Sequence, residues 1–439
     1  MAEPDVSQLM TVAQAMAVID AAPVAPRVVR MPLAAAMGRR LAQDVAADRD
    51  YPPFNKSTMD GFAVRSGDIS RPPATLRVTA RVPAGTFPDT PLAPGEAMAI
   101  MTGAPLPAGA DGVVPVEDAE ESDGTVRINR SDGVTRFVSP RGADCQKGRV
   151  VLAKGALLGP AQLAVAAAVG AAEVDVFDAP RAAVLATGDE LVPADKAPQP
   201  AQIRNSNNVM LAGLLRRFGC AVTDLGIAPD HPDDIRLAIS RALHDHDVLL
   251  VSGGMSMGEH DHVPRVLQDL GVTLKVSKLR IKPGKPFVFG VKGTATERRS
   301  DGATEGTDAT SGTEAPPAPG DPRFVFGLPG NPVSGFVCAV RLVSRLIDRL
   351  SGVGVQERWQ AGRLLTGLPA NGPREFYMPV LRSVMPGRVS AQAVLPAIKP
   401  LEWKGSGDLF TLAAANALLV RAANEPPLPD GTLVRVLEI

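Results

Sequence analysis

The run DVLLVSGG at residues 247–254 decides the fold. A short apolar stretch that begins with an aspartate and ends in two glycines is typical of a buried strand followed by a turn. Similar strands are predicted at residues 182–186 and 221–227. Helical spacing of apolar residues predicts helices over residues 205–218 and 233–245. Strands that alternate with helices favour a parallel sheet covered by helices, and ligands of such sheets bind beyond the carboxyl ends of the strands.

Three turns rich in glycine and proline belong to this region. They are SGGMSMG at residues 252–258, KPGKP at 282–286 and LPGNPVS at 328–334. Glycine lets a ligand approach the main chain, and two ammonium groups held on a rigid turn suit an oxyanion or a phosphate. Lys282 and Lys285 therefore mark either an anion pocket or a basic surface loop. The grouping of three such turns favours the pocket.

The overall composition is that of a globular protein without a general affinity for polyanions. The 439 residues exceed what one hydrophobic core supports, so several domains are expected. A net charge of −1 gives no general attraction to nucleic acid or to an anionic membrane. An aromatic content of 4% argues against a stacking surface for single-stranded nucleic acid. Any anion site must therefore be local.

The cysteines and the first residues indicate the compartment. Cys145, Cys220 and Cys338 are widely spaced and form no C-x-x-C pair, which fits buried thiols in a reducing cytoplasm. The N-terminal residues lack the pattern of a signal peptide, and no apolar run approaches the roughly 20 residues that span a bilayer. We expect a soluble, cytoplasmic protein.

The chain around the predicted sheet divides by pattern into further regions. Residues 11–22 show the spacing of an amphipathic helix, and short β-like runs fill residues 27–150. Residues 293–322 contain almost no apolar side chains, which predicts a disordered insertion. A helix is predicted at residues 333–350. The β-like runs from residue 355 onward indicate a last, small β domain.

Acidic residues gather at turns of the sheet region, among them Asp189, Glu190, Asp230 and Asp261. Oxygen ligands at loop ends suit Mg²⁺, whereas solvated or helix-capping carboxylates are the alternative, and the two interpretations are balanced. The histidines fall in one region but lack H-E-x-x-H spacing, so a zinc site is not expected. G-x-S-x-G, P-loop and G-x-G-x-x-G motifs are absent, which argues against a serine hydrolase, a P-loop NTPase and a Rossmann dehydrogenase.

Two segments of the β-rich region stand out, STMDGFAV at residues 57–64 and MTGAP at 101–105. Their polar residues fit either hairpin turns or a site, and the residues alone leave both open. Together with the three turns above, with TGDE at 187–190, IRNSN at 203–207 and the late GSG at 405–407, they make the chain similar to a known family. It resembles the MoeA family of molybdopterin molybdenumtransferases, which includes the E domain of gephyrin, over nearly its whole length.

The resemblance implies a multidomain α/β protein. Its central α/β sheet domain with flanking helices would have the molybdopterin-binding fold, joined by a β-rich domain, a small C-terminal β domain and a discontinuous linking α/β domain. The expected boundaries are 179–354 for the sheet domain with the disordered insertion at 292–322, 28–146 for the β-rich domain, 355–439 for the C-terminal domain, and 1–27 with 147–178 for the linking domain. The helix at residues 11–22 would then pack against the segment around 148–176.

The family's activity implies a reaction that the residues alone do not define. Its members take adenylylated molybdopterin and molybdate, hydrolyse the adenylyl phosphoanhydride with Mg²⁺, and insert molybdenum with release of AMP. The anion pocket would then hold molybdate and phosphate groups. The resemblance assigns Asp60, Thr102, Glu190, Lys282 and Lys285 to catalysis, Gly253, Gly254, Ser256, Pro329, Asn331, Pro332, Ser334, Arg374 and Ser406 to substrate binding, and Asp230, Asp261 and Glu190 to Mg²⁺.

Family members are also homodimers whose active site is shared between subunits. This implies that Asp60 and Thr102 act at the site of the partner chain. The other implied partners are a molybdopterin adenylyltransferase and the molybdoenzymes that accept the cofactor, with no nucleic acid and no membrane.

Two positions depart from the family pattern. Asn55 and Lys56 stand where Asp-Asn is common, and His231 follows Asp230 where a second aspartate is frequent. The first change makes the loop less acidic, and the second weakens the metal assignment of Asp230. The alternative functions are a scaffold protein on the same fold and a molybdopterin adenylyltransferase.

Overall fold

The structure is a computed structural model that describes residues 6–255, 262–293, 321–383 and 395–439. The chain divides into two compact units, each described by itself. The first unit comprises Met1–Val29 and Phe177–Ile439, and the second comprises Arg30–Val176. Within the described ranges, no helix combines the length and the apolar character needed to cross a membrane.

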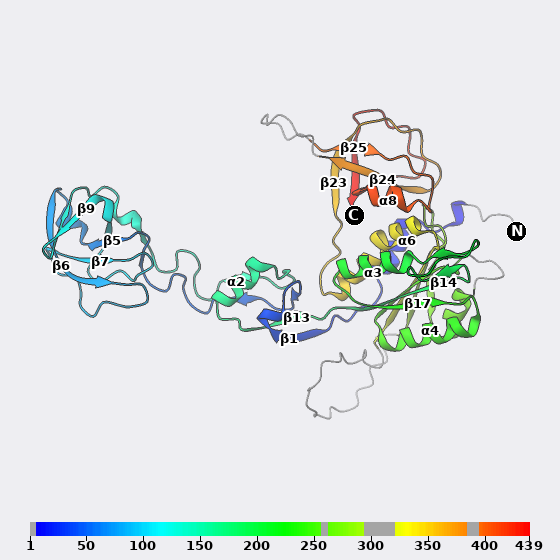
Figure 1. Cartoon of the computed structure of the whole chain (residues 1–439), viewed down its shortest axis with the longest axis horizontal. Coiled ribbons are helices and arrows are strands. Elements are labelled where there is room, and N and C mark those ends of the chain that lie inside the picture. Colours follow the sequence, from blue (N-terminus) through cyan, green and yellow to red (C-terminus); the bar gives the residue numbers. More distant parts are fainter. Residues whose placement is uncertain (1–5, 256–261, 294–320, 384–394) are drawn as a thin grey trace, which may run out of the picture. The chain divides into compact units, whose positions relative to one another are not determined.

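A six-stranded sheet forms the centre of the first unit (Figure 1). In spatial order its strands are β17 (Ala221–Ala228), β14 (Arg181–Thr187), β18 (Val248–Ser252), β22 (Arg323–Leu328), β21 (Val288–Lys292) and β19 (Thr273–Ser277). The first four are mutually parallel, as expected, but β21 and β19 run antiparallel to their neighbours. These two strands were not among those predicted from the sequence, and antiparallel neighbours need no crossover helix between them.

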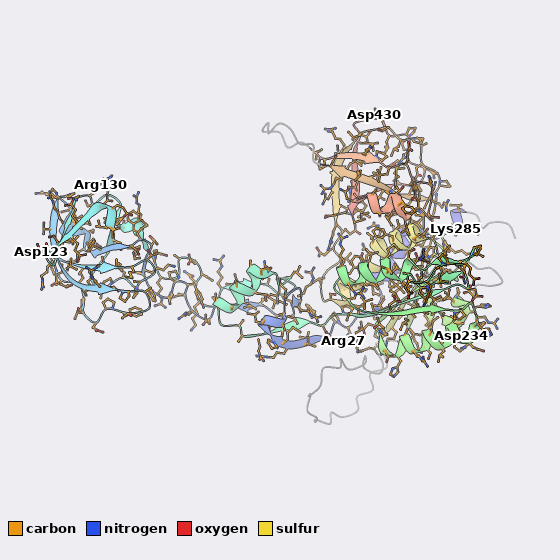
Figure 2. All side chains as sticks on the ribbon, in the orientation of Figure 1. Arg27, Asp123, Arg130, Asp234, Lys285 and Asp430 are labelled. Atoms are coloured by element: carbon orange, nitrogen blue, oxygen red, sulfur yellow. The ribbon has the colours of Figure 1, made fainter. Side chains whose placement is uncertain are left out.

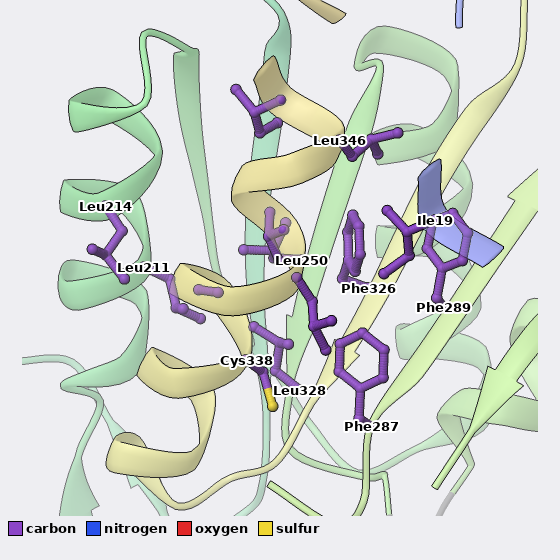
Figure 3. Packing of buried hydrophobic residues seen from close by; sticks show 14 of the residues in the cluster. Ile19, Leu211, Leu214, Leu250, Phe287, Phe289, Phe326, Leu328, Cys338 and Leu346 are labelled. Atoms are coloured by element: carbon purple, nitrogen blue, oxygen red, sulfur yellow. The ribbon is translucent and has the colours of Figure 1, made fainter. Parts of the chain in front are cut away.

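Helices cover both faces of this sheet (Figure 1). α3 (Asn207–Arg217) and α6 (Pro332–Cys338) lie on one face, while α4 (Pro232–Asp245) lies on the other; α5 (Val263–Asp269) packs with α4. The side chains of β18 alternate between the two faces, and Leu250 packs in the core of the α3 and α6 side. The buried aromatic rings Phe287, Phe289 and Phe326 fill the same core (Figure 3). Burial on both faces explains why these strands read as continuous apolar runs.

The helix predicted at residues 333–350 is present but not uniform. It consists of α6, a π-helical segment at Ala339–Val343 and α7 (Ser344–Leu350). The sequence pattern did not predict the π segment. Figure 3 shows that this helix presents Cys338 and Leu346 to the core.

The amphipathic helix near the N-terminus is α1 (Val12–Asp20), and Thr11 caps it by accepting a hydrogen bond from the Gln14 N–H. Its buried face, including Ile19, packs on α7, the π segment and β19 (Figure 3). This helix belongs to the first unit and residues 148–176 to the second, so the two segments do not form one compact unit as was expected. An apolar helix face shows that a helix is packed, not which element it packs on.

The second unit contains the expected β-rich region. Its six-stranded sheet has the order β8 (Gly112–Pro115), β5 (Gly61–Val64), β7 (Glu96–Ile100), β6 (Ala74–Val82), β10 (Thr125–Ile128) and β9 (Ala119–Ser122). A smaller part contains the sheet β1 (Val28–Pro32), β13 (Glu173–Phe177) and β2 (Arg40–Leu41), the pair β3 (Val45–Ala46) and β12 (Val150–Leu152), and α2 (Pro160–Ala168). The segment that pairs with residues 150–177 is thus 28–46, and not the helix before it.

The C-terminal sheet of the first unit contains β20 (Ile281–Lys282), β24 (Glu375–Ser383), β25 (Ala397–Pro400), β23 (Trp359–Leu364), β27 (Leu433–Glu438) and β26 (Ala417–Arg421). An additional β24–β26 pairing closes five of these strands into a ring. β20 joins this sheet rather than the central one, although it lies within the sequence of the central domain. A short helix, α8 (Leu409–Ala414), follows the GSG segment.

The remaining short strands form two local pairs, β4 (Lys56–Ser57) with β11 (Val138–Ser139) and β15 (Leu191–Val192) with β16 (Ile203–Arg204). The strand pattern resumes after the predicted insertion, as expected, because β21 and β22 pair directly. The predicted insertion itself, apart from its first and last residues, lies outside the described residues.

Candidate functional site

A cavity of about 440 Å³ lies between the KPGKP turn, the start of α6 and the C-terminal sheet. We call it the cation cavity. Figure 2 shows Lys285 on the side of the first unit where the C-terminal sheet lies. The lining residues are Lys282, Pro283, Gly284, Lys285, Pro286, Pro329, Asn331, Ser334, Arg374, Trp403, Lys404, Gly405 and Ser406. Four of them are basic and none is acidic, although the whole chain has a net charge of −1.

The KPGKP turn packs against the hydrophobic core. Gly284 has a φ of +119°, and a Cβ atom at this position would lie 2.7 Å from the sulfur of Cys338. Burial raises the pKa of the Cys338 thiol to about 12, so this group is neutral and acts in packing. On the cavity side, the ammonium of Lys282 lies 4.8 Å from the centre of the Phe376 ring, which in turn stacks on Trp403 at 5.8 Å. The turn is therefore held in one shape.

The GSG loop completes the cavity from the C-terminal domain. The N–H of Val333, in the first turn of α6, donates to the carbonyl of Ser406 at 3.0 Å. Asp408 caps α8 and accepts hydrogen bonds from the N–H groups of Lys404 and Thr411 at 3.0 and 3.1 Å. These hydrogen bonds lower the pKa of Asp408 to about 2. Hydrogen bonds therefore hold the GSG loop in place both before and after Ser406.

The carboxyl ends of β14, β17 and β18 form a second region, rich in acidic groups and glycine. The N–H of Asp230 donates to Asp189 Oδ1 at 3.1 Å. The pKa of the Asp230 carboxyl is raised, first by burial and then by the charges of Asp189 and Glu190. Carboxylates that repel each other in this way are favourable surroundings for a cation.

Two buried hydroxyl groups at the same strand ends have unused hydrogen-bonding capacity. Thr187 Oγ1 and Ser252 Oγ are buried, and neither has a partner among the described residues. Gly253 and Gly254 adopt positive φ angles of +97° and +61° and pack closely against Thr187, since an added Cβ would lie 3.1 and 3.0 Å, respectively, from Thr187 Oγ1. Buried hydroxyls without partners are rare in proteins, so they indicate a place where a polar ligand group binds.

A cavity of about 550 Å³ adjoins these carboxylates, and we call it the strand-end cavity. Its lining residues are Gly188, Asp189, Leu191, Pro193, Ala194, Asn205, Asn208, Val209, Asp224, Gly226, Ile227 and Pro229. Among the described residues, its lining comprises acidic, amide and apolar side chains and no basic ones. The loops behind the two cavities touch, because a Cβ on Gly330 would lie 3.8 Å from the Cα of Gly253.

In the second unit, Asp60 and Thr102 come together from separate turns. Thr102 donates to Asp60 Oδ1 through its N–H at 2.6 Å and through its hydroxyl at 2.8 Å. These bonds lower the pKa of Asp60, which therefore remains a carboxylate at neutral pH. Both side chains are exposed. Hydrogen bonding fixes this carboxylate in one orientation towards solvent.

The structure thus groups the expected site residues in three places. The cation cavity collects Lys282, Lys285, Pro329, Asn331, Ser334, Arg374 and Ser406, with Pro332 beginning α6 beside it. The strand ends carry Glu190, Asp230, Gly253 and Gly254, whereas Asp60 and Thr102 belong to the second unit. Ser256 and Asp261 lie outside the described residues.

Sequence reasoning missed Trp403 and Lys404, which line the cation cavity. Their position directly before the GSG segment was the available signal. It also missed Asn205 and Asn208 in the strand-end cavity. Asn205 lies within the IRNSN segment, and Asn208 follows it directly. No group of three or more metal-binding side chains is found within the part of the chain that the structure describes.

Three family profiles match consecutive parts of the chain. Residues 10–170 match the MoeA N-terminal region (domains I and II), residues 183–349 match a probable molybdopterin binding domain, and residues 361–439 match the MoeA C-terminal region (domain IV).

Relatives and solved structures agree with these matches. A molybdopterin molybdenumtransferase of Nostoc sp. is 34% identical over 411 residues, which is 92% of this chain and 87% of that protein. A molybdopterin molybdenumtransferase of Haemophilus influenzae is 35% identical over 74% of this chain and 72% of that protein. A crystal structure of a Pyrococcus molybdopterin biosynthesis MoeA protein superimposes with a TM-score of 0.78 at 30% identity, covering 98% of this chain and 99% of that one.

Proposed function

The chain belongs to the MoeA family and acts in molybdenum cofactor biosynthesis by molybdenum insertion, and we propose that it does so by a Mg²⁺-dependent reaction that releases AMP. The proposed substrates are molybdate and adenylylated molybdopterin. An adenylyltransferase would supply the latter, and molybdoenzymes would accept the product. The free cysteines support the cytoplasm as its compartment.

The charge of the cation cavity is the single observation that carries this proposal. Lys282, Lys285 and Arg374 surround a space that is lined by no acidic side chain of the described residues. Ser334 and Ser406 add hydroxyl donors at its walls. A small dianion such as molybdate would receive charge-assisted hydrogen bonds on several sides. We therefore assign molybdate to this cavity.

The strand ends are suited to the phosphates of the adenylylated substrate and to Mg²⁺. Mg²⁺ commonly uses only one or two protein carboxylates together with substrate phosphates and water. Asp230 and Glu190 supply such groups, and the pKa of Asp230 is raised first by burial and then by the charges of Asp189 and Glu190. When bound, Mg²⁺ would neutralise charge on the leaving phosphate. Gly253 and Gly254 allow the main chain to approach that phosphate closely.

The second unit supports a homodimer. α2 is almost entirely apolar, yet Ala166 is its one buried residue. Leu157 and Val165 nearby are 51% and 38% exposed. Exposed apolar surface of this kind marks a protein interface, so we propose that a second copy of the chain covers it. In such a dimer Asp60 and Thr102 would act at the site of the partner subunit.

AMP release tests the proposed reaction. The purified protein is incubated with adenylylated molybdopterin, molybdate and Mg²⁺, and AMP is quantified by chromatography. We expect release that requires both molybdate and Mg²⁺. Release no greater than in a blank without protein would overturn the proposal, whereas ATP-dependent adenylylation of molybdopterin would support the adenylyltransferase alternative.

A further inference from the structure

The cation cavity has walls that come from two different domains of the first unit. Asn331 and Ser334 belong to the loop before α6 and to its first turn. Lys282 and Arg374 come from β20 and from the residue before β24, which pair in the C-terminal sheet. The width of the cavity therefore depends on how the helix and this sheet are fastened together.

A series of hydrogen bonds behind the cavity joins the helix that begins with α6 to strand β24 of the C-terminal sheet. The Nε of Arg341, in the π segment that follows α6, donates to the hydroxyl oxygen of Tyr377 at 3.0 Å. The Tyr377 hydroxyl in turn donates to a carboxylate oxygen of Glu375. Tyr377 is fully buried, and burial raises the pKa of its hydroxyl, as does the charge of Glu375. The hydroxyl therefore remains protonated and serves as both acceptor and donor.

The alternation of side chains along β24 connects these hydrogen bonds to the cavity. Successive side chains of a strand point to opposite faces. Tyr377 faces the core that contains the helix, while Phe376 contacts the ammonium of Lys282 and stacks on Trp403 at the cavity. The register pairs Lys282 with Phe376 and Ile281 with Glu375. A displacement of Tyr377 therefore moves the strand that supports Lys282.

The same arginine is also held from its other side. Arg341 Nη1 donates to Glu357 at 3.0 Å, and Glu357 is bonded to Arg345 of α7 and accepts from the indole N–H of Trp359 at 2.5 Å. Burial acts to raise the pKa of Glu357, but the hydrogen bond from Trp359 and the charge of Arg341 outweigh it and hold this pKa below its usual range. The carboxylate is therefore charged and locks Arg341 in place.

The π segment accounts for the position of Arg341. A π turn contains more residues than an α turn, so it shifts the side chains that follow relative to a regular helix. Leu342 and Val343 of this segment remain in the apolar core, while the Arg341 side chain, only 10% exposed, reaches the Tyr377 hydroxyl. π segments are frequent at functional sites.

We propose that Arg341 and Tyr377 are positioning residues for the oxyanion, which set the distance between the α6 wall and the β20–β24 wall of the cation cavity. The inference rests on the proposed function only in that it takes molybdate as the occupant of this cavity. Neither residue lines the cavity. Both act through the elements that carry Ser334 and Lys282.

The test compares molybdate binding by the full-length wild type and by Tyr377→Phe, using isothermal titration calorimetry with inorganic molybdate alone. Removal of the hydroxyl leaves Arg341 and Glu375 without their common partner, so the two walls are no longer fixed. We expect the Kd for molybdate to rise about five- to tenfold, the size of effects that residues without ligand contact have on coupling. Turnover at saturating molybdate should remain near the wild-type value.

Tyr51→Phe is the matched control, because Tyr51 also donates from its hydroxyl to a carboxylate, that of Asp48, but lies in the second unit. This variant should bind molybdate with the wild-type Kd. A double-mutant cycle with Lys282→Ala separates positioning from loss of stability. The effect of Tyr377→Phe should shrink when Lys282 is absent, because the displaced wall then carries no ammonium.

The possible results separate the positioning role of Tyr377 from the assignment of molybdate to the cavity. Equal Kd values for the wild type and Tyr377→Phe would overturn the positioning role and leave the proposed function intact. A wild type that binds no molybdate would overturn the assignment of molybdate to the cavity, and the positioning role with it. If Tyr377→Phe does not fold, Arg341→Lys serves in its place. It keeps the charge but loses the two-sided geometry of the guanidinium, so a wild-type Kd there would also contradict the proposal.

Discussion

The cation cavity and the strand-end cavity lie in the same compact unit but gather opposite charges. Among the residues that the structure describes, four basic and no acidic side chains line the first cavity, whereas Asp189 and Asp224 and no basic side chain line the second. Their loops meet at Gly253 and Gly330. This difference is the basis for proposing that an oxyanion binds in one place and a cation with its phosphates in a neighbouring, separate place.

Lys285→Ala should give the largest effect and should affect only the cation cavity. Loss of one fixed cation facing an anion costs roughly 100-fold or more in turnover. We expect a loss of this size in AMP release, measured at saturating Mg²⁺, with an unchanged melting temperature. Lys275→Ala is the control, because Lys275 is an exposed lysine on β19 that does not line the cavity. Wild-type turnover by Lys285→Ala would remove the functional contrast between the two cavities.

Asp230→Asn should affect the acidic strand ends and leave the cation cavity unchanged. Removal of one carboxylate from the acidic strand ends should raise the Mg²⁺ concentration for half-maximal AMP release by roughly tenfold or more. The Kd for molybdate, measured without Mg²⁺, should not change. Asp245→Asn is the control, since Asp245 is the last residue of α4 and lies beside the start of β18, at the edge of the sheet opposite to these strand ends. An equal Mg²⁺ requirement in both variants would contradict the metal assignment.

Gly253→Ala tests how closely the loop between the cavities must pack. Its φ of +97° and a distance of 2.4 Å from an added Cβ to the carbonyl oxygen of Thr187 predict both backbone strain and a clash. Gly219 has a similar φ of +94° but nothing within 4 Å. We expect a loss in the free energy of unfolding of about 1 kcal/mol for Gly219→Ala. Gly253→Ala should lose about 2 kcal/mol more, as measured by urea unfolding. Equal losses would show that the loop can move.

Asp408→Asn should give the smallest effect, and one that depends on pH. The pKa of Asp408 falls from an ordinary 3.8 to about 2, so its charge stabilises the folded GSG loop above pH 3.8. This stabilisation is lost as the pH falls towards 2. Asparagine can still cap the helix, so we expect a small decrease in melting temperature at pH 7 that disappears at the acidic end. A decrease that is constant from pH 7 to pH 3 would contradict this role.

The sequence predicted the central strands well, because strands that are buried on both faces carry apolar residues at every position. It could not predict that β20 leaves the central domain for the C-terminal sheet. A two-residue strand such as Ile281–Lys282 has no periodicity of its own, and its partner β24 follows about 90 residues later.

The candidate site shows the same limit. Turns such as KPGKP indicate anion binding by their own chemistry, but nothing local links them to Arg374 or Ser406, which were expected only through the family resemblance. Trp403 and Lys404 have no distinctive pattern, and only the folded chain brings them to the cavity. The Arg341–Tyr377 contact is of the same kind, because it joins a helix to a strand 36 positions away.

The pairing of Lys292 with Arg323 has a practical consequence. β22 runs parallel to β14 and β18, so it begins at the edge of the sheet opposite to the carboxyl ends where the site residues gather. The two ends of the intervening segment are therefore anchored side by side and far from the chemistry. Loop closure costs little more when such a segment is lengthened, so this point of the chain suits an affinity tag, a fluorophore or a surface anchor.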